Sequence, residues 1–224
     1  MNRKESVFTL KDCALLAIAT GKKAHNLREL RDRLEVIDEG SIYYHFWGGL
    51  LLPRFDDPEY NNDFASWARH GLHDNVMAER FSVLNPADFR DLEEIRRELI
   101  ELIEERLAEC ETVPWAKKDN QFNFIRSKIV IFNTDKRIYK PSGLADCLPD
   151  MTASSIFYHF IDARRRTEDN ADDFTAWLRD FGDEYSHLRG MLGGIDPYFG
   201  TLEELKKNLI KVFADFFQKK LEIL

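Results

Sequence analysis

Two histidines in near-identical surroundings are the residues of this chain best suited to chemistry. The stretch SIYYHF returns further along as SIFYHF, which places His45 and His159 at matching positions with an offset of 114 residues. An imidazole titrates near neutral pH, so it can transfer protons or bind a metal. If both stretches lined one cleft between two halves of the molecule, the histidines with Tyr44 and Tyr158 would form a ligand-binding or catalytic site there.

A structural role fits the same pattern. If the first stretch is helical, Ile42 and Phe46 share a face, so much of the segment must be buried. A histidine at the edge of that face needs a hydrogen-bond partner, such as a backbone carbonyl group or the carboxylate of Asp63, which the second copy matches with Asp173. Two imidazoles alone are too few ligands for a metal. Both roles therefore stay open, and the sequence predicts no cofactor.

A second pair of histidines, in the run HGLH, has the spacing of some metal ligands. His70 and His73 stand three residues apart, and such a pair can face one way on a helix. The second copy has Asp180 and Asp183 at the corresponding positions, and the chain has no HExxH motif. We expect a solvated helix end here, with a metal site as the alternative.

Arg166 ends a dense basic cluster, ARRR, shortly after the second YHF. On a continuing helix it would lie on the same side as His159, where a guanidinium group can clamp a phosphate or a carboxylate. The first copy has Gly48, Gly49 and Leu50 in the comparable region, so this ligand site would belong to one copy only. The neighbouring acidic residues also fit a solvated, charged face.

The repeat extends far beyond the two histidine stretches. DFASWAR returns as DFTAWLR, and LEEIRRELI returns as LEELKKNLI, in the same order along the chain. Matching blocks in one order indicate an internal duplication. We expect repeat units at residues 7–110 and 122–221, joined by a linker at 111–121 that contains a proline and several charges.

Each unit is predicted to be mainly α-helical with a small β-hairpin, so that the chain consists of two tandem pseudo-symmetric helical repeats. The run SKIVIFNTDKRIYK has two apolar segments around turn-forming residues, and the first unit has Gly21 at the matching turn. Asn26 then fits a helix N-cap, with Glu29 placed for a capping box. The last helix of each unit carries an apolar stripe, and the aromatic residues of the two DF segments are expected in the core.

These motifs resemble a known group of sequences. The run TGKKAHNLREL, followed by SIYYHFWGG and NDFASWAR and then by the copies FYHFIDARRR and DDFTAWL, is similar to an uncharacterised prokaryotic family of unknown function. Its members carry this helical YHF and NDFxxW domain in tandem. The resemblance covers nearly the whole chain, and it implies a compact duplicated helical domain without an established activity or catalytic residue.

The first copy is also similar to the helix-turn-helix of tetracycline-repressor-type regulators. In that arrangement Ser41, Tyr43 and Tyr44 would approach the major groove of DNA. The usual glycine of the turn is missing, and the apolar run WGGLLL follows where phosphate-binding lysines are expected. The net charge of −8 also opposes binding to phosphates. A DNA-binding regulator therefore stays an alternative that the charge disfavours.

The composition favours a cytoplasmic protein. No apolar run approaches the roughly 20 residues of a membrane helix, and the charged start MNRKESVFTLKD does not fit a secretory signal. The three cysteines show neither CxxC nor Cys/His spacing, so we expect reduced thiols without zinc or disulfides. We expect no membrane association and no nucleic-acid partner.

The sequence has no phosphate loop, nucleophile elbow or nucleotide-binding glycine motif. We therefore expect a non-catalytic interaction or regulatory protein that binds a protein partner. The alternative is an enzyme, or a ligand- or metal-binding protein, with its site between the units around His45 and His159. Substitution of both histidines separates the two classes, because a structural role predicts lower stability and a site predicts ligand loss from a folded protein.

Overall fold

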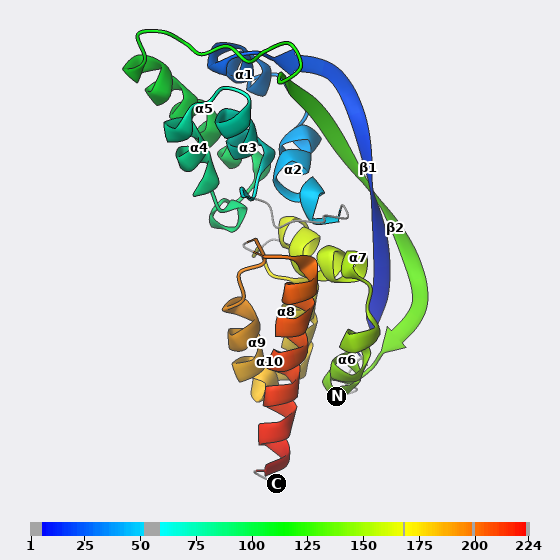
Figure 1. Ribbon diagram of the computed structural model, residues 1–224. Helices are drawn as coiled ribbons and strands as arrows, with labels where there is room; N and C mark the ends of the chain where they lie inside the picture. Colours follow the sequence, from blue (N-terminus) through cyan, green and yellow to red (C-terminus); the bar gives the residue numbers. More distant parts are fainter. Residues whose placement is uncertain (1–5, 52–58, 168, 199, 223–224) are drawn as a thin grey trace. The chain divides into compact units, whose positions relative to one another are not determined.

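The computed structural model describes residues 6–51, 59–167, 169–198 and 200–222 (Figure 1). Most of these residues are helical, and two long strands form one sheet, so the mainly α class is confirmed. The chain divides into two compact units. We call Leu15–Ile129 the middle unit, and Met1–Ala14 together with Val130–Leu224 the terminal unit. These units follow from contacts, whereas the repeat units 7–110 and 122–221 with the 111–121 linker stay a prediction.

The sheet consists of β1, Phe8–Ala24, and β2, Phe122–Ile138, which run in opposite directions (Figure 1). The hydroxyl group of Thr20 donates to the carbonyl oxygen of Phe124 at 2.7 Å, and that of Thr134 donates to the carbonyl oxygen of Leu10 at 2.7 Å. Each strand passes from one compact unit into the other, because the unit boundaries fall within the strands.

The predicted hairpin in each repeat is wrong. Each segment is one continuous strand, in which Gly21 and Asp135 have the positive φ angles of +73° and +58°. The amide of Lys22 donates to the hydroxyl of Thr20, so these turn-type residues kink the strand locally, as in a β-bulge, without reversing it. The strand partner is the other long strand, about a hundred residues away in sequence.

In the described residues of the middle unit the α-helices are α1 (Leu27–Leu34), α2 (Glu39–Trp47), α3 (Asp63–His70), α4 (Asn75–Ser82) and α5 (Leu92–Glu109). The side chain of Asn26 accepts from the Glu29 amide at 2.9 Å, which confirms this N-cap. The Glu29 carboxylate accepts from the amide of His25 at 2.9 Å, one residue before the cap. Helix α1 therefore begins where local capping chemistry places it.

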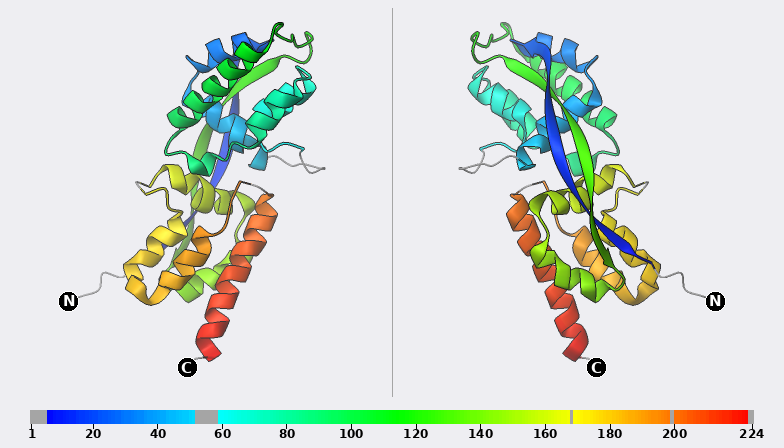
Figure 2. Two further views of the ribbon diagram at one scale, coloured as in Figure 1. Left: turned by 90° about the vertical axis from the view of Figure 1, so that its left-hand side faces the viewer. Right: turned by 90° about the vertical axis from the view of Figure 1, so that its right-hand side faces the viewer.

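The helices of the terminal unit are shorter and less regular before the last one (Figure 2). They are α6 (Pro141–Cys147), α7 (Ala153–Ile156), α8 (Asp173–Leu178), α9 (Ser186–Gly193) and α10 (Leu202–Glu222). The SIFYHF stretch starts in α7 and continues as one π-helical turn, Phe157–Ile161, followed by a 3-10 turn, Asp162–Arg165. The matching first stretch forms the regular helix α2.

Apolar stripes and aromatic residues close each core as predicted. The stripe of α5 buries Leu92, Ile95, Leu99 and Ile103, and that of α10 buries Leu202, Leu205, Leu209 and Phe213. The aromatic residues of the DF segments, Phe64, Trp67, Phe174 and Trp177, are also buried. Full burial of one such side chain contributes roughly 1.5–3 kcal/mol, so these residues hold the helices together.

No helix within the described residues is long and apolar enough to cross a membrane. The cysteines are free thiols; Cys13 is buried, and Cys110 and Cys147 are half-buried.

Candidate functional site

Ser41 and His45 of α2 hold a single residue of β2. The hydroxyl group of Ser41 donates to the carbonyl oxygen of Ile125 at 2.6 Å, and the amide of Ile125 donates to Nε2 of His45 at 3.2 Å. The serine and the histidine are four residues apart, so they project from one face of the helix. Together they satisfy both backbone groups of Ile125 on the strand edge that faces away from β1.

The terminal unit repeats this arrangement on β1. Ser155 donates to the carbonyl oxygen of Lys11 at 2.6 Å, and the amide of Lys11 donates to Nε2 of His159 at 2.9 Å. The serine, histidine and strand residue of one unit each stand 114 positions from their counterparts in the other. The SIxYHF motif is therefore a strand-holding device, which explains its serine and its histidine at once.

The other nitrogen of each imidazole bonds a carboxylate. Nδ1 of His45 lies 2.8 Å from Oδ2 of Asp63, and Nδ1 of His159 lies 2.8 Å from Oδ2 of Asp173. A backbone amide can only donate, so Nε2 accepts the hydrogen bond from the strand. Nδ1 therefore carries the proton of the neutral imidazole and donates a hydrogen bond to the carboxylate. Both nitrogens of each neutral imidazole are therefore engaged.

The aspartates are available because other residues cap their helices. Asn62 accepts from the amide of Ala65 at 2.9 Å and caps α3, and Asp172 accepts from the amide of Thr175 at 2.8 Å and caps α8. The next residue in each case is the aspartate that binds histidine. A carboxylate in the first helical turn is also stabilised by the helix dipole.

Ser41, His45 and Asp63 have the residue types of a catalytic triad but not its geometry. In a triad the serine hydroxyl bonds to Nε2 of the histidine, which takes its proton. Here the hydroxyl bonds to a backbone carbonyl group, and Nε2 accepts from a backbone amide. The three residues therefore lack an activated nucleophile.

Aromatic rings enclose both histidines. The imidazole of His45 lies 4.6 Å from the ring of Phe122, and that of His159 lies 4.8 Å from the ring of Phe8, measured between ring centres. Each imidazole side chain is only 3% exposed. All of these partners lie within the histidine's own compact unit. The geometry supports the structural role for both histidines.

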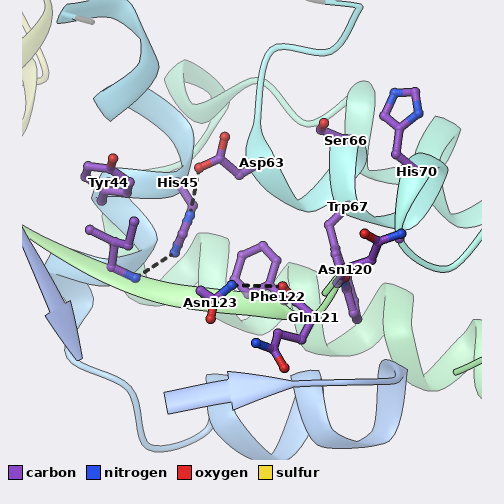
Figure 3. A pocket seen from close by; sticks show the side chains of 12 residues that line it. Tyr44, His45, Asp63, Ser66, Trp67, His70, Asn120, Gln121, Phe122 and Asn123 are labelled. Carbon is purple, nitrogen blue, oxygen red and sulfur yellow. Dashed lines mark hydrogen bonds and ion pairs between the residues drawn. The ribbon is translucent and has the colours of Figure 1, made fainter. Parts of the chain in front are cut away.

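An open pocket of about 390 Å³ lies beside His45 in the middle unit (Figure 3). Its wall includes the carboxylate of Asp63, the ring of Tyr44 and the polar side chain of Ser66, and Trp67 and Phe122 add aromatic surface. The volume is within the roughly 300–1,000 Å³ of small-molecule sites. The carboxylate of Asp63 is 48% exposed, although the histidine that it binds is buried.

The matching carboxylate of the terminal unit is covered by Arg166. Its Nη2 donates to Asp173 at 3.0 Å and to the carbonyl oxygen of Tyr158 at 2.9 Å, and its Nε donates to Asp162 at 3.0 Å. The guanidinium carbon lies 4.1 Å from the centre of the Tyr158 ring. Asp173 is consequently only 21% exposed.

The contact between Asp173 and Arg166 shifts the pKa values of both groups. Burial opposes ionisation of Asp173, but the hydrogen bond from His159 and the charge of Arg166 hold its pKa below the usual range. Burial likewise acts to lower the pKa of Arg166, and the carboxylate of Asp173 raises it overall. Two carboxylates match the charge of Arg166, so the geometry gives no support to the predicted phosphate or carboxylate clamp.

Of the second histidine pair, His70 lines the same pocket as His45 and Asp63, whereas His73 is not part of its wall. Nε2 of His70 lies 3.2 Å from Glu59 on the surface, and His73 is exposed in the α3–α4 connection. Across the described ranges, no three His, Cys, Asp or Glu side chains are grouped so that they could hold a metal ion. Burial raises the pKa of Tyr44 and of Tyr158, which favours the protonated phenols.

A DNA-recognition helix would need Ser41, Tyr43 and Tyr44 on the surface. These residues are 0%, 3% and 8% exposed. Helix α2 faces the core and β2, so it cannot enter a DNA groove, and the helix-turn-helix alternative loses its geometric basis.

Two features of the pocket were not predicted. Asn120 and Gln121, from the segment predicted as a linker, line its wall, and the indole nitrogen of Trp67 donates to the Asn120 carbonyl oxygen at 2.7 Å. Gly71 lies so close that a Cβ there would approach the Trp67 ring at 2.5 Å. The only feature of the sequence that indicates the open pocket wall is the glycine at position 71, where the matching position of the second copy has Phe181.

The fold and the site define a mainly helical protein that holds a two-stranded sheet through serine and histidine side chains and has an open pocket in its middle unit. The chain belongs to the family of unknown function DUF5752, which matches residues 5–214. It is also similar to the solved structure of OrfY from Thermoproteus tenax, with 26% sequence identity, a TM-score of 0.82, and coverage of 94% of this chain and 95% of that chain. The search of curated proteins found no match.

Proposed function

We propose that the protein acts without catalysis, by binding a ligand group or a partner protein in the pocket of the middle unit. The observation that carries the proposal is the contrast between His45, whose two nitrogens are both engaged, and Asp63, whose carboxylate is 48% exposed in that pocket. An accessible carboxylate can bind a ligand, whereas an imidazole with both nitrogens engaged has neither of them free for acid–base catalysis.

An internal duplication fits this function. If the chain arose as two tandem copies, helix α2 of the first copy holds the strand of the second, and the SIFYHF segment of the second copy holds the strand of the first. Such an exchange would connect two similar modules through their strands. One copy covers its own carboxylate with Arg166, and the other leaves its carboxylate open for a partner.

The proposal includes a protein partner, a regulatory role and a cytoplasmic location, which rest on the sequence features given above. The enzyme alternative around both histidines has less support, because each imidazole bonds a strand amide and a carboxylate of its own unit. The proposal therefore assigns the histidines to the scaffold and the pocket to recognition.

The test is a thermal-shift screen with small cationic, neutral and anionic probes, followed by analysis of each probe for turnover. We expect at least one probe to raise the Tm of the wild-type chain and to be recovered unchanged. The variant Ser66→Trp, which fills the pocket, should lose this shift, and Val83→Trp, at a residue 73% exposed on the surface, should keep it. Conversion of a probe to product that stops in a folded His45→Asn variant would contradict the proposal.

A further inference from the structure

Arg166 of the terminal unit supplies a template for what the pocket of the middle unit binds. Its guanidinium group lies over the ring of Tyr158, 4.1 Å from the ring centre, and donates to the carboxylate of Asp173 at 3.0 Å. An aromatic face and a carboxylate are the two groups that attract a guanidinium ion most strongly in proteins. This unit therefore shows the site in its occupied form.

The middle unit has the same tyrosine, histidine and carboxylate. The rings of Tyr44 and His45 meet edge to face with centres 5.3 Å apart, against 5.0 Å for the matching pair in the terminal unit. His45 lies 2.8 Å from Asp63, the same separation as in the matching pair. All three residues line the pocket (Figure 3).

The two units differ in whether a basic side chain pairs with the aspartate. Within the described ranges, no lysine or arginine forms an ion pair with Asp63, and its carboxylate is 48% exposed, against 21% for Asp173. The carboxylate therefore presents an uncompensated negative charge at the pocket wall. An anion is disfavoured there, because it would face this charge at short range.

Two positions that match between the units carry a glycine in the middle unit and a larger residue in the terminal unit. Gly48 stands at the position that matches Asp162, so the additional carboxylate contact of Arg166 is absent. Gly71 stands at the position that matches Phe181, whose ring packs on Trp177 with centres 5.0 Å apart. The wall of the pocket therefore contains a glycine where the matching residue of the terminal unit carries a ring.

We infer that the pocket of the middle unit binds a guanidinium group, with the exposed carboxylate of Asp63 as its principal contact and the largely buried ring of Tyr44 as part of the pocket wall. The inference rests on the proposed function and names its ligand chemistry. The guanidinium group comes from a small free molecule or from an arginine side chain of a partner protein. The two sources share the same contacts, and a titration separates them.

The experiment titrates the full chain with agmatine and with N-acetylarginine amide, and uses N-acetylcitrulline amide as the neutral isostere. We expect at least one guanidinium probe to bind at least tenfold more tightly than the citrulline probe. Binding of agmatine alone indicates a small free ligand, and binding of the arginine amide indicates an arginine residue. The absence of binding by both guanidinium probes, or binding of the citrulline amide as tight as that of the tighter guanidinium probe, would overturn the inference.

The repeat provides matched variants. Asp63→Asn should weaken guanidinium binding at least tenfold while the fold is retained, whereas Asp173→Asn should bind as the wild type does. Ser66→Trp should also abolish binding, which covers the case in which Asp63→Asn is unstable. The chain has an arginine of its own, Arg54, outside the described residues. The titration is therefore repeated with Arg54→Gln, which removes this guanidinium group. Binding that occurs only in the Arg54→Gln chain would overturn the inference.

The two proposals fail in different ways. If neither guanidinium probe binds but a neutral or anionic probe binds in a manner sensitive to Ser66→Trp, the guanidinium inference is wrong and the proposed function stands. If no probe of any charge binds, the inference and the proposed pocket function are both wrong.

Discussion

Arg166 donates to the carboxylate of Asp173 at 3.0 Å. The same carboxylate accepts from His159 at 2.8 Å, so one aspartate connects a surface arginine to the buried imidazole that holds β1. In the middle unit the corresponding chain of contacts ends at Asp63, because no arginine or lysine of the described ranges pairs with it. We therefore propose a recognition role for the pocket of the middle unit and a stabilising role for the matching contacts of the terminal unit.

Asp173 should stabilise the protein in a pH-dependent way. At pH 7, Asp173→Asn should lower the free energy of unfolding by about 1–3 kcal/mol, because Arg166 and His159 lose a charged acceptor. The pKa of Asp173 is held below the ordinary value of 3.8, so its contribution is present above pH 3.8 and is lost as the pH falls through the lowered pKa. Denaturant unfolding at several pH values measures the difference.

For that experiment the control is Asp63→Asn, which has no arginine partner among the described residues and should lower stability less. A gap between wild type and Asp173→Asn that stays constant or widens below pH 3.8 would show that the carboxylate is not the stabilising group.

Arg166→Ala should leave a vacant guanidinium site over Tyr158. The variant should have a lower Tm, because the carboxylate of Asp173 loses its hydrogen bond and charge partner. Millimolar methylguanidinium should restore part of this loss in Arg166→Ala. It should not stabilise the control Arg179→Ala, which removes an arginine that pairs with the exposed carboxylate of Asp169. Calorimetry measures both shifts, and equal responses of the two variants would refute the template.

Ser41→Ala should destabilise the middle unit by on the order of 1–3 kcal/mol, because the part-buried carbonyl group of Ile125 loses its hydrogen-bond donor. Ser155→Ala should have a similar cost, since it leaves the Lys11 carbonyl group without its donor in the terminal unit. Ser82→Ala serves as the control, because its hydroxyl bond is exposed. Equilibrium unfolding in urea checks the three variants, and a cost for Ser41→Ala no larger than the control's would refute the strand-holding role.

Cys13 should resist alkylation in the folded protein. Burial, together with the charges of Asp12 and Asp162, raises the pKa of its thiol to about 12, and the sulfur atom donates to the carbonyl oxygen of Ser154 at 3.3 Å. The half-buried Cys110 and Cys147 should react with iodoacetamide at neutral pH. Peptide mass spectrometry measures modification at each site, and rapid labelling of Cys13 without unfolding would count against its burial in the terminal unit.

The parts of the fold that depend on local chemistry were predictable from sequence. Asn26 caps α1 because its side chain reaches an amide three residues on, and the stripe of α10 is visible in the spacing of its apolar residues. The hairpins were wrong because Gly21 and Asp135 favour a left-handed backbone, which serves a bulge as well as a turn. Local sequence does not distinguish these outcomes.

The site depended on long-range contacts. The sequence placed His45 near Asp63, but the partner of its Nε2 is the amide of Ile125, 80 residues away. A backbone amide carries no signature in the residue type, so the strand-holding role could not be deduced from the motif. The open pocket was equally hidden, because its wall includes Asn120 and Gln121 from the segment predicted as a linker.

The most direct test of the central claim, that both histidines hold strands and do no chemistry, is long-range proton–nitrogen NMR on the histidine-labelled protein near neutral pH. The structure predicts that His45 and His159 are neutral, with the proton on Nδ1 and with Nε2 accepting a hydrogen bond. A proton found on Nε2 of either residue would contradict the account, because the imidazole could not then accept from the strand amide.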